Sequence, residues 1–304
     1  MLTDYFQWPL ESLTRAAAQL PPIFRNAFLM KALSKVGQLI TFAKPITTNF
    51  GLSNSFKVSY PDPMDRVLVF GRPEDHVAER GALFSLQALL PSASAFVDIG
   101  AHVGYFTYFA KLRCVDKPVY FFEPQPKLFD FIQRAIWDNG LSGVTGFQCG
   151  IGREEGEAPF FIHANTTRSS LVKSDDPNAY SDSKIKVTTF DAFVEDCNLG
   201  DNLFVKVDIE AGEFDFLEGA QRSLPKISYL VLEVLLPSEK NGLIKTACDR
   251  GGFEPYYLCD LNLIHCPQGV YPYHPPHVNW LLCRLKPHEL AEKLRYTRLR
   301  VTEV

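Results

Sequence analysis

After Pro73 the sequence alternates between short, almost continuously apolar runs and segments with helical periodicity, and this alternation constrains the fold more than any other feature. Short apolar runs bounded by glycine, proline or charged residues are typical of strands that are buried on both faces. Strands that alternate with helices require crossover connections, and these favour a mostly parallel sheet with helices on both sides. The sequence therefore predicts an α/β fold of the Rossmann-like type.

The expected elements follow from these patterns. Strands are predicted at residues 95–99, 119–122, 144–149, 184–190, 203–209, 229–234, 254–259 and 278–285. Helices are predicted at residues 74–90, 105–113 and 126–139, and after residues 212 and 238. Because no helix is expected between the last two strands, they should form an antiparallel hairpin at the edge of the sheet.

The chain before residue 74 follows a different pattern. From Leu10 to Phe42 apolar positions recur at helical spacing, with a break at Pro21 and Pro22, which predicts two amphipathic helices followed by short strands such as 56–58. We interpret residues 1–73 as an accessory region, either a cap or a helix pair through which two copies associate, with a membrane-surface or partner-binding helix as the alternative. Residues 74–290 should form the main domain and 291–304 a tail.

Charge and composition exclude some classes of partner. The 304 residues carry a formal net charge of −4 and no long run of Lys or Arg, which argues against a nucleic-acid substrate and favours a small neutral or polar one. No run approaches about 18 consecutive apolar residues, so no transmembrane segment is predicted. The seven cysteines include no Cys-x-x-Cys pair, as expected for buried thiols in a reducing compartment, and we expect a cytoplasmic location.

The turn after the first strand of the main domain is the first candidate site, because ligands of open parallel sheets bind beyond the carboxyl ends of the strands. Gly100 permits a tight turn, and Gly104 lets the next helix pack close to the strand. Asp98 ends the strand, where its carboxylate would repel a pyrophosphate but attract an ammonium or sulfonium cation. A helix N-cap is the structural alternative for Asp98.

The second and third strands add further candidates. Glu123 ends the second strand before Pro124, where its carboxylate would accept hydrogen bonds from both hydroxyls of a ribose, with a solvated strand end as the alternative. Gln148, Cys149 and Gly150 at the end of the third strand are expected to meet an adenine edge. Together these positions predict a nucleoside site.

Three carboxylates follow the strand at 203–209, and crowding them is costly unless they bind something or hold a proton. Asp208 and Glu210 are candidate general bases, whereas the dipole at a helix N-terminus is enough to explain Glu213. His102 is a second candidate base, with an ordinary loop histidine as the alternative. Lys206 lies within the strand and would pair with one of the acids, so it is assigned no catalytic role.

Two further segments contain side chains that could bind a metal or a substrate. His274 and His277 have a spacing that suits a metal, but two intervening prolines favour an ordinary rigid loop, and no metal is predicted. Residues 165–183 are rich in Asn, Thr, Ser and Asp and are long for a connection, which indicates a lid or a loop that binds the substrate, or else plain disorder.

These residues resemble the FkbM family of methyltransferases over roughly residues 70 to 285. The resemblance rests on Val-Asp-Ile-Gly-Ala-His-Val-Gly-Tyr-Phe-Thr at 97–107, Phe-Glu-Pro-Gln-Pro at 122–126, and Lys-Val-Asp-Ile-Glu-Ala-Gly-Glu at 206–213, with Leu-Glu-Gly-Ala at 217–220. It departs from the family at His102, which is often Asn there, and at Ala211-Gly212, which inverts the usual order. Neither departure removes a charged group.

The resemblance implies a class I fold, S-adenosylmethionine as the donor, and typically O-methylation of a hydroxyl on a sugar or natural product. In this interpretation the cofactor-binding residues are Asp98, Gly100, Ala101, His102, Gly104, Glu123, Pro124, Cys149 and Asp208. The candidate catalytic residues are Asp208, Glu210 and His102. The competing interpretations are a non-catalytic scaffold that binds the donor, and a nicotinamide-dependent enzyme acting on a nucleotide sugar.

Overall fold

The computed structural model describes residues 46–48, 56–58, 77–162, 180–209, 212–235, 242–270 and 277–303. The chain divides into two compact units, one comprising residues 1–77 and 130–142 and the other residues 78–129 and 143–304. In the first unit, strands β1 (Ile46–Thr48) and β2 (Phe56–Val58) pair antiparallel. The side chain of Asn139 joins β2 to the end of α6 (Pro126–Asp138) within this unit. Its Oδ1 accepts a hydrogen bond from Lys57 N at 2.7 Å, and its Nδ2 donates to Lys57 O at 2.6 Å.

The remaining elements follow the predicted alternation closely. In chain order they are α4 (Val77–Leu89), β3 (Ala95–Ile99), α5 (Tyr105–Arg113), β4 (Val119–Phe122), α6 (Pro126–Asp138), β5 (Val144–Phe147), β6 (Gly150–Ile151), β7 (Gly156–Ile162), β8 (Tyr180–Thr188), α7 (Phe190–Asp196), β9 (Leu203–Val207), α8 (Glu213–Glu218), β10 (Ile227–Leu235), α10 (Leu243–Gly251), β11 (Glu254–Cys259), β12 (Asn262–His265), β13 (His277–Cys283), α11 (Pro287–Leu294) and β14 (Arg300–Glu303).

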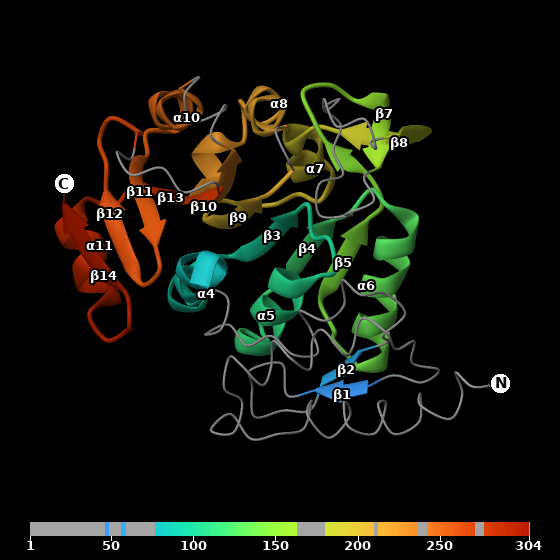
Figure 1. Ribbon diagram of the computed structural model, residues 1–304, viewed down its shortest axis with the longest axis horizontal. Helices are drawn as coiled ribbons and strands as arrows, with labels where there is room; N and C mark the ends of the chain where they lie inside the picture. Colours follow the sequence, from blue (N-terminus) through green and yellow to red (C-terminus); the bar gives the residue numbers. More distant parts are fainter. Residues whose placement is uncertain are drawn as a thin grey trace, which may run out of the picture. The chain divides into compact units, whose positions relative to one another are not determined.

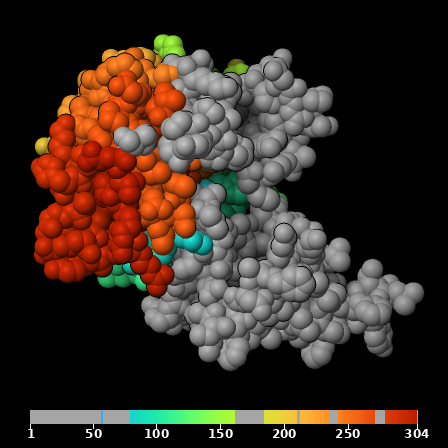
Figure 2. Space-filling view, turned by 60° about the vertical axis from the view of Figure 1, so that its left-hand side comes forward, coloured from blue at the N-terminus to red at the C-terminus, as the bar shows by residue number. Residues whose placement is uncertain are grey.

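Nine of these strands form one sheet in the order β14-β12-β11-β13-β10-β9-β3-β4-β5. The five strands from β10 to β5 run parallel, and the predicted Rossmann-like α/β fold is confirmed. The predicted antiparallel pair is also present as β11 and β13, but it does not lie at the edge. Strand β12 forms a hairpin with β11, and β14 pairs parallel with β12, so the segment expected to be a tail extends the sheet. Figure 2 shows these C-terminal segments, orange to red, as one continuous surface.

Residues 150–188 contribute a second, three-stranded sheet in the order β6-β8-β7. The strand predicted at 184–190 is therefore present as β8, but it pairs with β6 and β7 and not with the large sheet. Thr189 follows the strand and caps the next helix, since its hydroxyl accepts a hydrogen bond from Ala192 N at 3.0 Å.

One face of the large sheet is apolar across β4, β3, β9, β10, β13 and β11, and we call it the apolar face. Successive side chains of a strand point to opposite faces, so Val97, Val205 and Leu232 share this face. They are fully buried together with Phe190 of α7, Phe216 of α8, and Leu243 and Ile244 of α10. Figure 1 shows α7, α8 and α10 on this side of the sheet.

The opposite face carries ionisable groups near the carboxyl ends of the parallel strands, and we call it the charged face. Asp98 lies opposite Lys206 in the pairing of β3 with β9, so both side chains point to this face. Lys206 lies opposite Val231, and Glu233, two residues further along β10, points the same way. Helices α4 and α5 lie on this side of the sheet (Figure 1).

Several predictions fall on residues that the structure does not describe. The two helices expected between residues 10 and 42 lie outside the described residues. Within the described part of the chain, every helix is too short or too polar to cross a membrane.

Candidate functional site

The turn after β3 is held against the neighbouring strands by backbone contacts. Gly100 N and Ala101 N both donate to Phe122 O, at 3.1 and 2.9 Å, and Asp208 N donates to Ile99 O at 3.0 Å. Gly100 has a φ of +79°, and a Cβ added there would lie 1.9 Å from Asp208 O. Only glycine fits this position, because the conformation and the approach of the Asp208 backbone both exclude a side chain. The predicted role of Gly100 in a tight turn agrees with this geometry.

His102 and Gly104 complete the turn. His102 has a φ of +53°, which is uncommon for a residue other than glycine and marks a constrained backbone. Its N–H donates to Glu123 Oε2 at 2.9 Å. Gly104, with a φ of +80°, is the N-cap of α5, and a Cβ there would lie 2.6 Å from the Tyr108 ring. The turn is therefore fixed at both ends by contacts within the protein.

Glu123 is the carboxylate that joins the turn to β4. It is 3% exposed, and its two oxygens accept hydrogen bonds from His102 N and from Gln125 N, each at 2.9 Å. Burial raises the pKa of Glu123 to about 8, although the two backbone hydrogen bonds lower it. Each carboxylate oxygen has a second lone pair, so Glu123 retains capacity to accept hydrogen bonds from hydroxyl groups.

Asp98 is more deeply buried than the sequence implied. Its side chain is 1% exposed, and Oδ2 accepts a hydrogen bond from the Thr107 hydroxyl of α5 at 2.7 Å. Oδ1 lies 3.9 Å from Lys206 Nζ and has no hydrogen-bond partner among the described residues. Burial raises the pKa of Asp98, whereas Lys206 and Thr107 lower it. At this depth the contacts of the Asp98 side chain are with Thr107 and, at a longer distance, with Lys206.

Lys206 and Asp208 link the end of β9 to Asp98. Lys206 Nζ lies 3.0 Å from Asp208 Oδ2, so the pairing expected for this lysine is present. The ammonium also lies 4.8 Å from the centre of the Phe106 ring, a cation–π distance. The Asp208 side chain is 28% exposed, whereas that of Lys206 is 4% exposed. Asp208 is thus the member of this group that a ligand can reach.

Glu79 of α4 belongs to the same charged group and was missed by sequence reasoning. Burial raises the pKa of Glu79 to about 7, with Lys206 lowering it and Asp208 raising it. Its Oε2 is buried without a hydrogen bond from any residue described. The helix packs directly on this face, since a Cβ on Gly81 would lie 3.0 Å from Leu258 Cβ. Helical periodicity does not reveal which polar residue of such a helix turns inward.

The end of the third strand lies beside Glu123. Glu123 N donates to Phe147 O at 3.2 Å, which brings the residues after β5 next to the turn after β4. Cys149 is half-buried, and burial raises the pKa of its thiol to about 11. Pro124 is half-buried too, whereas Gln148 is exposed. Cys149 at this position is a neutral, apolar side chain at pH 7.

The other predicted residues are distributed as follows. Glu213 is buried in the first turn of α8, as expected for an acid at a helix N-terminus. Glu210, His274 and the side chain of His277 lie outside the described residues, as does most of the loop predicted at 165–183, of which residues 180–183 begin β8. The structure thus brings together, at the carboxyl ends of the parallel strands, five of the predicted residues: Gly100, His102, Glu123, Asp98 and Asp208.

Comparison with known proteins gives concordant matches. A family model described as a methyltransferase FkbM domain matches residues 98–263. Methyltransferase 1 of Beauveria bassiana (strain ARSEF 2860) is 30% identical over 186 residues, which cover 55% of this chain and 74% of that protein. Methyltransferase sdnD of Sordaria araneosa is 26% identical over 197 residues, which cover 55% and 76%.

Solved structures that match this chain share little sequence identity with it, and their TM-scores are below 0.5. Precorrin-6y C5,15-methyltransferase from Geobacter metallireducens GS-15 has a TM-score of 0.37 at 14% identity, covering 67% of this chain and 88% of that chain. TrmK of M. capricolum, solved in complex with S-adenosyl-homocysteine, has a TM-score of 0.38 at 14% identity, covering 66% of each chain.

Proposed function

The chain belongs to the FkbM methyltransferase family, and we propose that it transfers the methyl group of S-adenosylmethionine to a hydroxyl oxygen of a sugar or natural-product acceptor. The family was predicted from motifs at 97–107, 122–126 and 206–213, and the family model matches residues 98–263. The observation that carries the proposal is the buried carboxylate of Glu123, hydrogen-bonded to the backbone of the turn at His102.

The residues at this edge of the sheet suit a donor that combines a nucleoside with a positive charge. Glu123 accepts the ribose hydroxyls with the lone pairs that its backbone hydrogen bonds leave free. Gly100 and Ala101 present backbone without large side chains, and Pro124 and Cys149 offer apolar surface to an adenine ring. Asp208 supplies the negative charge that a sulfonium and an α-ammonium group require.

When bound, S-adenosylmethionine supplies an electrophilic methyl group on a cationic sulfur. The contribution of this chain is to align an acceptor hydroxyl and to take its proton. Asp208 is the favoured base, because its carboxylate is partly exposed and its position is fixed by Lys206 at 3.0 Å. Glu210 and His102 are the other two candidates for this role.

The donor site is tested by titration calorimetry with S-adenosylhomocysteine. We expect the wild-type protein to bind and Glu123→Ala to lose more than about 100-fold in affinity, because hydrogen bonds to a charged acceptor contribute roughly 1.5–3 kcal/mol each. Glu195→Ala is the matched control, since Glu195 is 72% exposed and pairs with Arg222 at the surface. We expect the control to bind like the wild type.

The outcomes separate the competing functions. Wild-type binding that is lost in Glu123→Ala supports the donor site, and transfer of a labelled methyl group to hydroxyl-bearing acceptors then tests catalysis. Donor binding without transfer to any acceptor would favour a non-catalytic scaffold. Binding of a nicotinamide dinucleotide in place of S-adenosylhomocysteine would overturn the proposal.

A further inference from the structure

The surroundings of Lys206 contain more negative than positive charge. Four carboxyl groups raise the pKa of Lys206 above its usual value, although burial by itself would lower it, and they come from four different segments. They are Asp208 after β9, Asp98 of β3, Glu79 of α4 and Glu233 of β10. Among the described residues, Lys206 is the one cation that faces Asp208, Asp98 and Glu79, so these three carboxyl groups and the ammonium together retain a negative surplus.

Lys206 is not equally close to its partners. Its ammonium lies 3.0 Å from Asp208 but 3.9 Å from Oδ1 of Asp98. That oxygen is buried and has no hydrogen bond from the described residues, so the charge of Asp98 is only partly compensated. The lysine therefore leaves negative charge in the interior while holding Asp208 at the accessible end of the group.

This group lies directly behind the turn at which we expect the donor to bind. The backbone of Asp208 contacts Gly100, where an added Cβ would lie 1.9 Å from Asp208 O. The Thr107 hydroxyl, which belongs to the helix that follows the turn, is hydrogen-bonded to Asp98 at 2.7 Å. A charge in this group therefore acts on a ligand in the turn through low-dielectric protein, where screening is weak.

We propose that Lys206 is a positioning residue that sets how strongly the donor site prefers the cationic sulfonium over the neutral thioether left after methyl transfer. This inference rests on the proposed function above. The negative surplus favours binding of the cationic donor. The ammonium of Lys206 limits that preference, so the affinity for the neutral product is closer to the affinity for the donor. The donor and the product share the same nucleoside and amino-acid parts, so the ratio of their affinities isolates the effect of charge.

The experiment measures the dissociation constants of S-adenosylmethionine and S-adenosylhomocysteine at pH 8, where Glu79, with a pKa of about 7, is mostly ionised. We expect Lys206→Met to shift the ratio toward the cation by at least about threefold, since a unit charge several ångströms away exerts an effect of this size at an effective dielectric of about 20. Lys206→Arg should restore the wild-type ratio. A loss of packing alone would weaken the binding of both ligands equally and leave the ratio unchanged.

Asp98→Asn provides an independent measurement if Lys206→Met does not fold. It keeps the shape of the side chain and removes one negative charge, so the ratio should shift by at least about threefold away from the cation. The double variant Lys206→Met, Asp98→Asn should return close to the wild-type ratio, because the two charge changes cancel.

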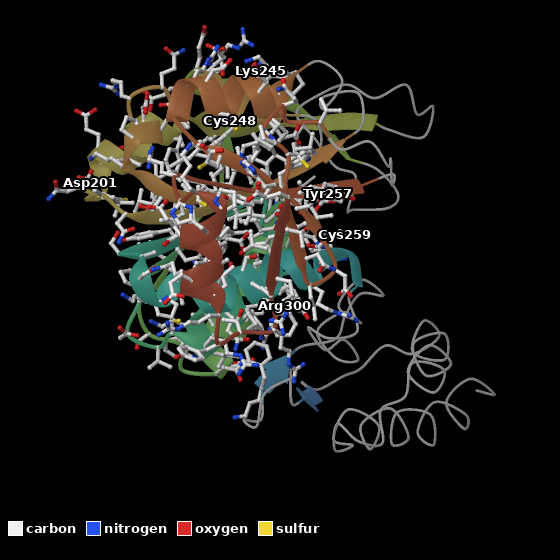
Figure 3. All side chains as sticks on the ribbon, turned by 90° about the vertical axis from the view of Figure 1, so that its left-hand side faces the viewer. Asp201, Lys245, Cys248, Tyr257, Cys259 and Arg300 are labelled. Carbon is white, nitrogen blue, oxygen red and sulfur yellow. The ribbon has the colours of Figure 1, made fainter. Side chains whose placement is uncertain are left out.

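The matched control is Lys245→Met. Lys245 pairs with Asp249 on α10, both side chains are more than half exposed, and Lys245 lies at the outer surface in Figure 3. We expect its ratio to equal that of the wild type. Unchanged ratios in both Lys206→Met and Asp98→Asn, in a protein whose wild type binds both ligands, overturn this inference alone. A wild type that binds neither ligand overturns the proposed donor as well.

Discussion

The two faces of the large sheet differ sharply near the carboxyl ends of β3, β9 and β10. On the apolar face, Val97, Val205 and Leu232 pack under α7, α8 and α10 with complete burial. On the charged face, Asp98 and Lys206 occupy the neighbouring positions of the same strands and are almost as fully buried. Adjacent residues of one strand thus lie in opposite environments.

The difference shows that the two faces of one sheet contribute differently to the stability of the fold. Burial of apolar side chains stabilises the fold by roughly 25 cal/mol for each Å² removed from water, with no requirement for a partner. Burial of a charge destabilises the fold unless another group compensates it. A requirement for stability alone therefore does not explain why charged residues occupy the charged face.

The largest expected effect concerns the turn that supports the charged face. Gly100→Ala should destabilise the protein by more than about 4 kcal/mol and abolish S-adenosylhomocysteine binding, because backbone strain adds to the overlap with Asp208. Urea unfolding and calorimetry measure the two effects. Gly252→Ala is the matched control, with a φ of +65° and no atom within 4 Å of an added Cβ, and it should cost only about 1 kcal/mol. Similar losses in both variants would contradict the role assigned to the close contact.

The apolar face should respond in stability only. Phe216→Ala removes a fully buried ring that contacts Phe190 at a centroid distance of 5.5 Å, and it should destabilise the fold by about 3–5 kcal/mol. The affinity of the folded protein for S-adenosylhomocysteine should stay within about twofold of the wild type, since no charged group moves. A large loss of affinity at a temperature where the variant is folded would mean that the two faces are not separate in function.

The smallest effect is a pH dependence at the carboxyl edge. The free protein holds Glu123 with a pKa of about 8, and ribose hydroxyls that donate to its carboxylate favour the charged form. Binding then lowers that pKa and releases a proton, so affinity for S-adenosylhomocysteine should rise by about tenfold from pH 6 to pH 8 and level off above. Glu123→Gln should bind more weakly and lose this dependence. Affinity that falls with rising pH would show that the protonated acid is the form that binds.

The same linkage predicts the stability of the free protein. The folded-state pKa of Glu123 lies above its unfolded value, so its contribution to stability is fully present below about pH 4.5 and is lost as the pH rises through about 8. Stability measured without ligand should therefore decline over this interval more in the wild type than in Glu123→Gln.

The sequence predicted the parallel core well because its strands are apolar on both faces. The strand at 95–99, the helix at 105–113 and the strand at 119–122 have the predicted bounds. Strand β12 escaped prediction because it is short and follows β11 after a turn at Asp260, which adopts a φ of +53°. Residues 291–304 were expected to be a tail, but they contain β14, which pairs with β12.

The sequence indicated which carboxylates lie at the candidate site but not how deeply each one is buried. Asp98, Glu123 and Asp208 were identified because each carboxylate stands at the end of an apolar strand. The burial of Asp98 and its compensation by Thr107 and Lys206 depend on the packing of α5 across the sheet, which no local pattern encodes. Glu79 lies before the motifs that carry the family resemblance, and only the fold brings it to Lys206.

The carboxyl groups around Lys206 come from segments that range from residue 79 in α4 to residue 233 in β10. Contacts between residues so distant in the chain close long loops, and the entropy cost of closing such loops slows their formation. The charged group is therefore complete only when α4 is packed on the sheet, because Glu79 belongs to that helix. The proposed ligand preference thus depends on the packing of α4, so local opening of this helix, followed by hydrogen exchange, should weaken the ability of the chain to distinguish a donor from its product.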